Sequence, residues 1–188
     1  TGKPAGFQRT WPNVVNYEAV FGLEQMRWSK IDVDMETHDV TLHFTRMVAG
    51  PIDYTPGAMR NSLKGMYYPN KRNPMRQGTR MHQVAMYVCY DAPLTMLADS
   101  PSRYLADASC TQFIADIPTV WDDTRVLDGA IGQYIAMARE KNGRWYAGAI
   151  NGWQARTLHL TLPDECRGRK ARMMCDGPNA DSVPEDYV

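Results

Sequence analysis

Asn142 and Gly143 form a turn signal between two segments of β-forming residues, at 133–139 and 144–150. Asn-Gly is a preferred sequence for a two-residue hairpin turn, because both central positions of that turn need positive φ angles. Two further strands are predicted after the hairpin, at 156–162, where leucine alternates with polar residues, and at 170–175. We therefore predict that residues 121–188 form a small antiparallel β domain.

Residues 1–120 have a different pattern, in which strand-like and helix-like stretches alternate. We predict a buried strand at 40–48, a helix at 83–90, a short strand at 94–97 and a helix at 102–116. Such alternation is typical of an α/β protein with a parallel sheet, whose ligand-binding loops follow the carboxyl ends of the strands. Because a (β/α)8 TIM barrel takes about 250 residues, this part is either a smaller α/β unit or the end of a barrel.

The overall charge indicates no partner, because 21 Lys and Arg residues balance 21 Asp and Glu residues. A zero net charge provides no long-range field for nucleic acid or for an anionic membrane surface. No apolar stretch reaches the roughly 18 residues of a membrane-spanning helix. The chain begins at Thr1 without an initiator Met, so we expect a piece of a longer protein in which any export signal would lie upstream.

Several chemistries lack their usual sequence markers. The four cysteines and four histidines include no Cys-x-x-Cys pair and no zinc-like spacing. Cys89 lies in an apolar run and is expected to be a buried, inert thiol, whereas a disulfide between Cys166 and Cys175 stays open. No Gly-x-Ser-x-Gly elbow, Walker loop or dinucleotide fingerprint is present. Structural roles are expected for the histidines, which are His38, His43, His82 and His159.

The segment between Tyr54 and Tyr90 contains no Asp or Glu, and its six cationic residues are Arg60, Lys64, Lys71, Arg72, Arg76 and Arg80. One interpretation is a lid or rim that meets anions or RNA. The other, which is the commoner outcome, is a solvated loop whose ionic partners lie elsewhere.

Two glutamates, Glu18 and Glu24, stand among aromatic and apolar residues, where an unpaired carboxylate is costly. Two carboxylates folded into one pocket can bind a hard cation through oxygen, or one of them can be kept protonated as an acid. The alternative is a structural ion pair with Arg9 or Arg27.

Two aspartates also follow loop or strand signals. Asp53 comes after the turn at Gly50-Pro51, and Asp99 comes after the predicted strand at 94–97. In a parallel sheet these positions face a ligand, but each side chain can equally cap the helix that follows.

An ordered set of motifs resembles glycoside hydrolase family 97 over almost the whole chain: Arg9-Thr-Trp-Pro-Asn13, Tyr17-Glu-Ala-Val-Phe-Gly-Leu-Glu-Gln25, Trp28-Ser29, Phe44-Thr-Arg46, Ala49-Gly-Pro-Ile-Asp-Tyr-Thr-Pro-Gly57, Gly78-Thr-Arg80, Asp99-Ser-Pro101 and Pro118-Thr-Val-Trp-Asp122. Members of this family have an N-terminal β-sandwich, a central (β/α)8 barrel and a C-terminal antiparallel β domain. The resemblance implies that residues 1–120 are the last βα units of the barrel and that residues 121–188 are most of the C-terminal domain.

The resemblance also implies site residues. Glu24 matches the family's catalytic acid, and Glu18 matches a carboxylate that binds the active-site Ca²⁺. The resemblance also implies Glu24 as a ligand of this ion. The sequences of residues 17–25 and 55–61 resemble the retaining α-galactosidase branch more closely than the inverting α-glucosidase branch. A retaining enzyme adds a nucleophilic carboxylate, which by the resemblance is an Asp upstream of Thr1.

The resemblance therefore predicts a hydrolase of terminal α-galactosides that acts on oligosaccharides in the periplasm or outside the cell. The partners that it implies are the upstream barrel and the N-terminal β-sandwich, with no nucleic acid and no membrane span. We expect these residues alone to be inactive. The alternatives are an inverting α-glucosidase of the same family and a non-catalytic carbohydrate-binding piece.

Overall fold

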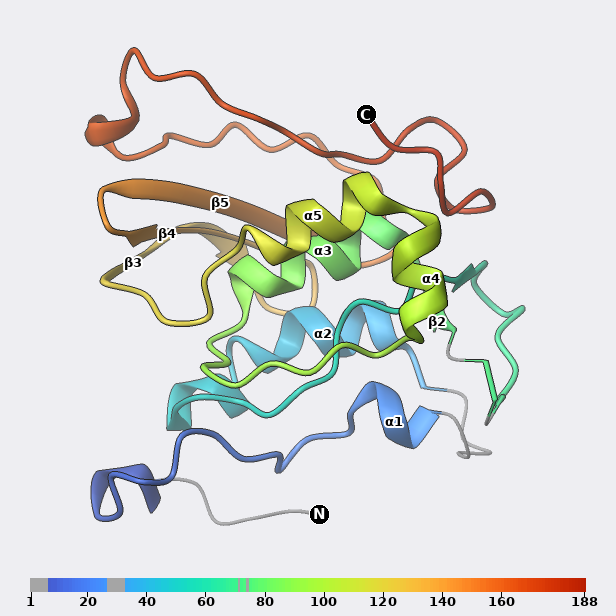
Figure 1. Cartoon of the computed structure of the whole chain (residues 1–188), viewed down its shortest axis with the longest axis horizontal. Coiled ribbons are helices and arrows are strands. Elements are labelled where there is room, and N and C mark those ends of the chain that lie inside the picture. The colour runs from blue at the N-terminus through green and yellow to red at the C-terminus, as the bar shows by residue number, and fades with distance from the viewer. Residues whose placement is uncertain (1–6, 27–32, 71, 74) are drawn as a thin grey trace.

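A computed structural model of the chain describes residues 7–26, 33–70, 72, 73 and 75–188. Figure 1 shows α3 (Arg80–Cys89) lying against the sheet of β3 (Asp123–Ala130), β4 (Tyr134–Lys141) and β5 (Arg144–Asn151). The helix α2 (Met35–Leu42) also contacts β5. One apolar core joins α2, α3, β4 and β5. In the described part of the chain, no helix has the length and apolar character needed to cross a membrane.

Side-chain caps decide where three of the helices begin. The carboxylate of Asp34 accepts a hydrogen bond from the Thr37 N–H at the start of α2. Thr79 caps α3 in the same way, and Asp107 caps α5 (Ala108–Ala115). Each cap satisfies one of the backbone N–H groups that the first turn leaves free.

The predicted helix at 102–116 is two helices, α4 (Pro101–Ala106) and α5. Asp107 separates them with φ −128° and ψ 77°, so that its side chain can cap α5. Its carboxylate also accepts from Arg80 and Tyr187, and these contacts hold the chain in the non-helical conformation. The helix predicted at 83–90 is confirmed as α3.

The buried strand predicted at 40–48 is wrong. Residues 35–42 form α2, and residues 46–49 form the 3₁₀ helix η2 (Arg46–Ala49). The buried positions Met35, Asp39 and Leu42 have helical spacing, but two of the buried side chains in this helix are carboxylates. A pattern of apolar residues therefore did not reveal the helix.

The short strand predicted at 94–97 is also wrong. The segment is irregular, and the hydroxyl of Thr95 donates to the carbonyl of Ala92, which turns the chain. Leu94, Met96 and Leu97 are exposed at 60%, 55% and 51%, so this apolar segment is not a core strand in the described structure.

The hairpin predicted around Asn142-Gly143 is confirmed. Lys141 pairs with Arg144, and the two turn residues have φ angles of 51° and 75°. The sheet order is β3-β4-β5, antiparallel throughout. This sheet, after a largely helical first part, confirms the coarser prediction of a C-terminal antiparallel β structure.

The strands predicted at 156–162 and 170–175 are wrong, because the structure assigns no strand to either. Leu158 and Leu160 are half-buried and alternate with exposed residues, but these segments have no strand partner, and Leu162 and Met173 are exposed at 46% and 74%. The pairing near the end of the chain is instead between Cys175 and Val188, joined by backbone hydrogen bonds of 2.8 and 3.0 Å. Cys166 and Cys175 are free thiols.

Parallel pairing in the first part is short. The strands β1 (Asn61–Ser62) and β2 (Arg76–Gln77) are parallel, and a separate parallel bridge joins Tyr17 to Ile52. The N–H of Ile52 donates to the carbonyl of Asp91 at 2.8 Å. Three extended segments, around residues 17, 52 and 91, therefore lie side by side.

Candidate active site

The parallel bridge between Tyr17 and Ile52 brings two carboxylates to neighbouring chain positions. Glu18 follows Tyr17, and Asp53 follows Ile52 and donates its N–H to the carbonyl of Tyr17 at 3.1 Å. Both side chains are half-buried. Because parallel segments end on the same side, these carboxylates occupy the edge at which parallel sheets carry their ligand sites.

The electrostatics of Asp53 reflect this neighbour. Burial, and after it the negative charge of Glu18, raise the pKa of the Asp53 carboxyl above its usual value. Two carboxylates in one partly buried place favour a bound cation or a retained proton. Sequence spacing did not pair Glu18 with Asp53, since the pairing depends on a contact between segments that are 35 residues apart.

Arg46 holds the main chain beneath these carboxylates. Its Nε donates to the carbonyl of Glu18 at 2.7 Å, and its Nη2 donates to the carbonyls of Tyr17 and Pro51 at 2.6 and 3.0 Å. Its Nη1 donates to the carbonyl of Gly50 at 3.0 Å. The guanidinium carbon also lies 4.7 Å from the centroid of the Tyr17 ring. Arg46 is therefore a functional candidate that its place in the sequence did not reveal.

Glu24 lies in the short helix α1 (Leu23–Met26), whose Leu23 and Met26 are buried while Glu24 itself is exposed. The chain bends between the two glutamates, since Ala19 has a φ of 58°, which is uncommon for a residue with a Cβ atom. His38 donates from Nε2 to the carbonyl of Phe21 at 2.9 Å, and this contact fixes the approach to α1. The role of Glu24 as an acid stays a prediction.

The donor set fits a hard cation only in part. Carboxylate oxygens suit Ca²⁺, which takes about six to eight oxygen ligands. Within the residues that the structure describes, no three His, Cys, Asp or Glu side chains come together at a metal-binding distance. Further oxygen ligands would therefore have to come from other parts of the protein. The alternative partner Arg27 lies outside the described residues.

Asp53 and Asp99 do not cap helices. No helix follows Asp53 directly, and the N-cap of α4 is Ser100. The carboxylate of Asp99 instead accepts from the N–H groups of Met59 and Ser100 at 3.0 and 2.8 Å, so it ties two segments together.

Among the cations of the 54–90 segment that the structure describes, Arg76 and Arg80 are buried. Arg76 is 1% exposed and lies within 2.5 and 3.1 Å of Glu36 and Asp39. Arg80 is 4% exposed and pairs with Asp107 and Glu185. The expectation of solvation is wrong for both, because their carboxylate partners on distant segments draw them into the core.

Three histidines also have protein partners. His38 donates to a carbonyl, His43 lies 3.2 Å from the carbonyl of Cys89, and His82 lies 2.6 Å from Glu36. Burial lowers the pKa of His43. Burial also raises the pKa of Cys89 to about 12, which fits the predicted inert thiol.

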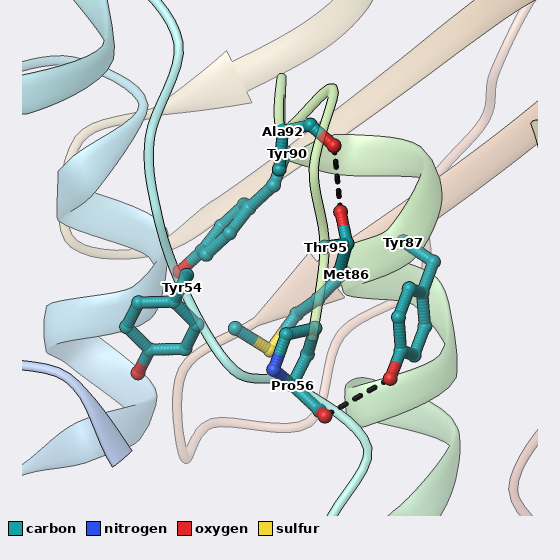
Figure 2. Close-up of a pocket in the computed structure, with 7 residues that line it drawn as sticks. All are labelled: Tyr54, Pro56, Met86, Tyr87, Tyr90, Ala92 and Thr95. Carbon is teal, nitrogen blue, oxygen red and sulfur yellow. Dashed lines mark hydrogen bonds between the residues drawn. The ribbon is translucent and has the colours of Figure 1, made fainter. Parts of the chain in front are cut away.

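Two hollows in the described structure are lined by residues other than Glu18 and Glu24. Figure 2 shows the lining of a cavity between α3 and the segments that carry Tyr54, Pro56 and Thr95, and the volume of this cavity is ≈ 10 Å³. This is the size of a single water molecule. A larger hollow of ≈ 380 Å³ lies between Arg60, Arg103 and Pro184. These two hollows therefore do not mark the position of the glutamates.

Carboxylates at the ends of neighbouring parallel segments, followed by an antiparallel β domain, fit the carboxyl-terminal part of a carboxylate-dependent hydrolase. Residues 120–188 match the family profile described as glycosyl-hydrolase 97 C-terminal, oligomerisation. The chain belongs to glycoside hydrolase family 97.

Its relatives are much longer. The chain is 50% identical over 190 residues to a retaining alpha-galactosidase from Bacteroides thetaiotaomicron, covering 100% of this chain and 28% of the relative. It is 32% identical over 176 residues to a probable retaining alpha-galactosidase from Streptomyces bingchenggensis, covering 94% of this chain and 25% of that protein. The chain thus spans less than a third of the length of these relatives.

Solved structures give the same family. A glycoside hydrolase family 97 enzyme from Pseudoalteromonas sp. strain K8 in complex with panose matches with a TM-score of 0.83 and 36% identity, over 97% of this chain and 29% of that chain. The structure of that family 97 enzyme with acarbose matches with a TM-score of 0.79 and 33% identity, over the same shares of the two chains.

Proposed function

We propose that this chain is the carboxyl-terminal part of a retaining α-galactosidase. The observation that carries the proposal is the 50% identity to a retaining alpha-galactosidase, which extends over the whole chain and includes the glutamate segment. The parallel bridge between Tyr17 and Ile52, with the segment around Asp91 hydrogen-bonded to Ile52, supports a further proposal, that residues 1–120 are the last units of a (β/α)8 barrel. Residues 121–188 are then the C-terminal β domain.

In this proposal, Glu24 is the general acid and base. Retention requires two displacements. In the first, a carboxylate from the preceding part of the enzyme attacks the anomeric carbon, while protonated Glu24 gives its proton to the departing glycosidic oxygen. In the second, Glu24, now a carboxylate, takes a proton from the water that attacks the glycosyl ester. The exposed position of Glu24 in α1 leaves its carboxyl accessible to a substrate bound between this chain and the rest of the enzyme.

We further propose that Glu18 and Glu24 contribute oxygen ligands to a Ca²⁺ ion. When bound, the ion would engage sugar hydroxyls and influence the local field on the acid. The position of Asp53 beside Glu18 supports this, because two half-buried carboxylates lie at neighbouring chain positions, where burial, and after it the charge of Glu18, raises the pKa of Asp53. The remaining ligands are proposed to come from the upstream barrel. We keep the periplasm or the extracellular space as the proposed location.

The test is Glu24→Gln in the complete enzyme, assayed on an aryl α-galactoside with a good leaving group and on an unactivated α-galactoside. Loss of a general acid typically lowers the rate by about 10²–10⁴-fold, and we expect this loss on the unactivated substrate but a much smaller loss in the first step of the aryl substrate. Azide, added as a nucleophile that needs no base, should restore turnover and give an α-galactosyl azide. Glu165→Gln, at an exposed glutamate, is the matched control and should be unaffected.

The alternative from the same family is an inverting α-glucosidase, favoured by the similarity to a family 97 enzyme bound to panose. α-Glucosides hydrolysed faster than α-galactosides, with a β-configured first product, would support it. Normal hydrolysis of the unactivated galactoside by Glu24→Gln would exclude Glu24 as the acid.

A further inference from the structure

We infer that Arg46 is a positioning residue of the active site. It orients the side chain of Glu18 by holding the main chain of the two segments that carry Glu18 and Asp53. The inference rests on the proposed function, since it assigns a task to a residue that does not itself touch substrate. It concerns Arg46, Glu18 and the parallel segments that end at residues 18 and 53.

The hydrogen bonds of Arg46 span two separate segments. Nε and Nη2 donate to the carbonyls of Glu18 and Tyr17, which belong to the first segment. Nη1 and Nη2 donate to the carbonyls of Gly50 and Pro51, which lead into the second. A guanidinium has five N–H donors in a rigid plane, so four described contacts use most of them. The planar guanidinium therefore cross-links the two chain segments through hydrogen bonds to their carbonyl groups.

The position of the Arg46 guanidinium gives this residue a role in the site. The regular pairing between the segments is the bridge of Tyr17 with Ile52, and the chain bends on both sides of it, at Ala19 with φ 58° and at Gly50 with φ 123°. The hydrogen bonds of Arg46 connect the two segments next to this bridge, where they have no further strand pairing. By fixing the carbonyl of Glu18, it limits the rotation of the backbone from which the Glu18 carboxylate projects.

The chemistry of the contacts points to orientation. The four hydrogen bonds end on main-chain carbonyls, and the aromatic ring of Tyr17 lies 4.7 Å from the guanidinium carbon. A lysine has a single ammonium group and cannot reproduce this planar fork. Arg46 is half-buried, so water does not readily replace all four donors. A displacement of about 1 Å in a catalytic group can lower the rate by about 10²-fold.

The experiment uses the complete enzyme with Arg46→Lys and Arg46→Ala, and Ca²⁺ itself as the probe. Arg139→Lys is the matched control, because Arg139 in β4 is 3% exposed and donates to the carbonyl of Cys89 at the end of α3. Each variant is measured for melting temperature with and without Ca²⁺, for kcat and KM on an unactivated α-galactoside, and for the Ca²⁺ concentration at half-maximal activity.

Replacing a group that orients a metal ligand typically costs about 10–100-fold in metal affinity or activity. We expect both Arg46 variants to need that much more Ca²⁺ and to show a smaller rise in melting temperature on adding Ca²⁺, with kcat affected more than KM. Guanidinium ion at millimolar concentration should restore part of the activity of Arg46→Ala, whereas methylammonium should not. Arg139→Lys should lower the melting temperature without changing the Ca²⁺ requirement.

Two results would overturn the inference. The first is an Arg46→Ala enzyme with wild-type kcat and Ca²⁺ requirement. The second is a folded Arg46→Lys enzyme that changes only in melting temperature, as Arg139→Lys does, because Arg46 would then be structural only. Failure of the proposed function looks different, since wild type would then ignore Ca²⁺ and Glu24→Gln would hydrolyse the unactivated substrate normally.

Discussion

Nη2 of Arg76 lies 2.5 Å from Oε1 of Glu36 in the core, where the two side chains are 2% and 4% exposed. The same nitrogen lies 3.1 Å from Asp39, and Nδ1 of His82 lies 2.6 Å from the other oxygen of Glu36. A buried charge network of this kind is strongly destabilising when one partner is removed, because the other charges stay buried.

Arg76→Gln is therefore expected to lower stability by about 3–5 kcal/mol. The measurement is the midpoint of thermal and urea unfolding of the complete enzyme. Arg125→Gln is the matched control, because Arg125 forms its ion pair with Glu165 at the surface. Equal unfolding midpoints for wild type and Arg76→Gln would show that the network does not contribute to stability.

The same network predicts an acid dependence. Burial alone would raise the pKa of Glu36, but the charges of Arg76 and His82 outweigh it and leave the pKa below the usual 4.5. The stabilisation is therefore complete above about pH 4.5 and is lost as the pH falls through the lower pKa of the folded state. We expect the melting temperature of wild type to fall steeply in this range.

Glu36→Gln tests that assignment. The variant has no carboxyl at position 36, so its melting temperature should be lower near neutral pH and should depend less on pH below 4.5. Parallel curves for wild type and Glu36→Gln would mean that another group titrates.

The approach of α3 to the sheet predicts the effect of a substitution at Gly148. A Cβ atom there would lie 2.9 Å from the Cβ of Val88 and 3.0 Å from the carbonyl oxygen of Ala85. Gly148→Ala should therefore force the helix away from β5 and destabilise the protein by about 1–3 kcal/mol. Ala149→Ser, on the exposed side of the same strand, is the control, and the two variants are compared by urea unfolding. A Gly148→Ala protein as stable as this control would contradict the close packing.

Calcium removal gives a prediction for Glu18. If Glu18 is a ligand, a chelator should reduce both activity and melting temperature of the complete enzyme, and added Ca²⁺ should restore them. Glu18→Gln should resemble the chelated enzyme and respond weakly to Ca²⁺. Glu140→Gln, at a glutamate in β4, is the control variant. Indifference of wild type to the chelator would remove the cation from the mechanism.

Local sequence signals predicted those elements that local chemistry controls. Asn142-Gly143 predicted the hairpin of β4 and β5 because the turn needs two positive φ angles, and the apolar spacing at 83–90 predicted α3. The helix α2 was missed because two of its buried residues are carboxylates whose partner, Arg76, is 37 and 40 residues away.

For the candidate site, the motifs identified Glu18 and Glu24, but not their surroundings. The neighbourhood of Glu18 and Asp53 depends on the Tyr17–Ile52 bridge, and the role of Arg46 depends on contacts with carbonyl groups, which are identical for every residue type. Backbone partners of this kind leave no residue signature, so only coordinates reveal them.

Leu94, Met96 and Leu97 have consequences for anyone who produces these 188 residues alone. Three exposed bulky apolar side chains within four positions promote self-association when no other part of the protein covers them. Such a preparation is expected to aggregate, whereas co-expression with the upstream domains proposed above should keep it in solution.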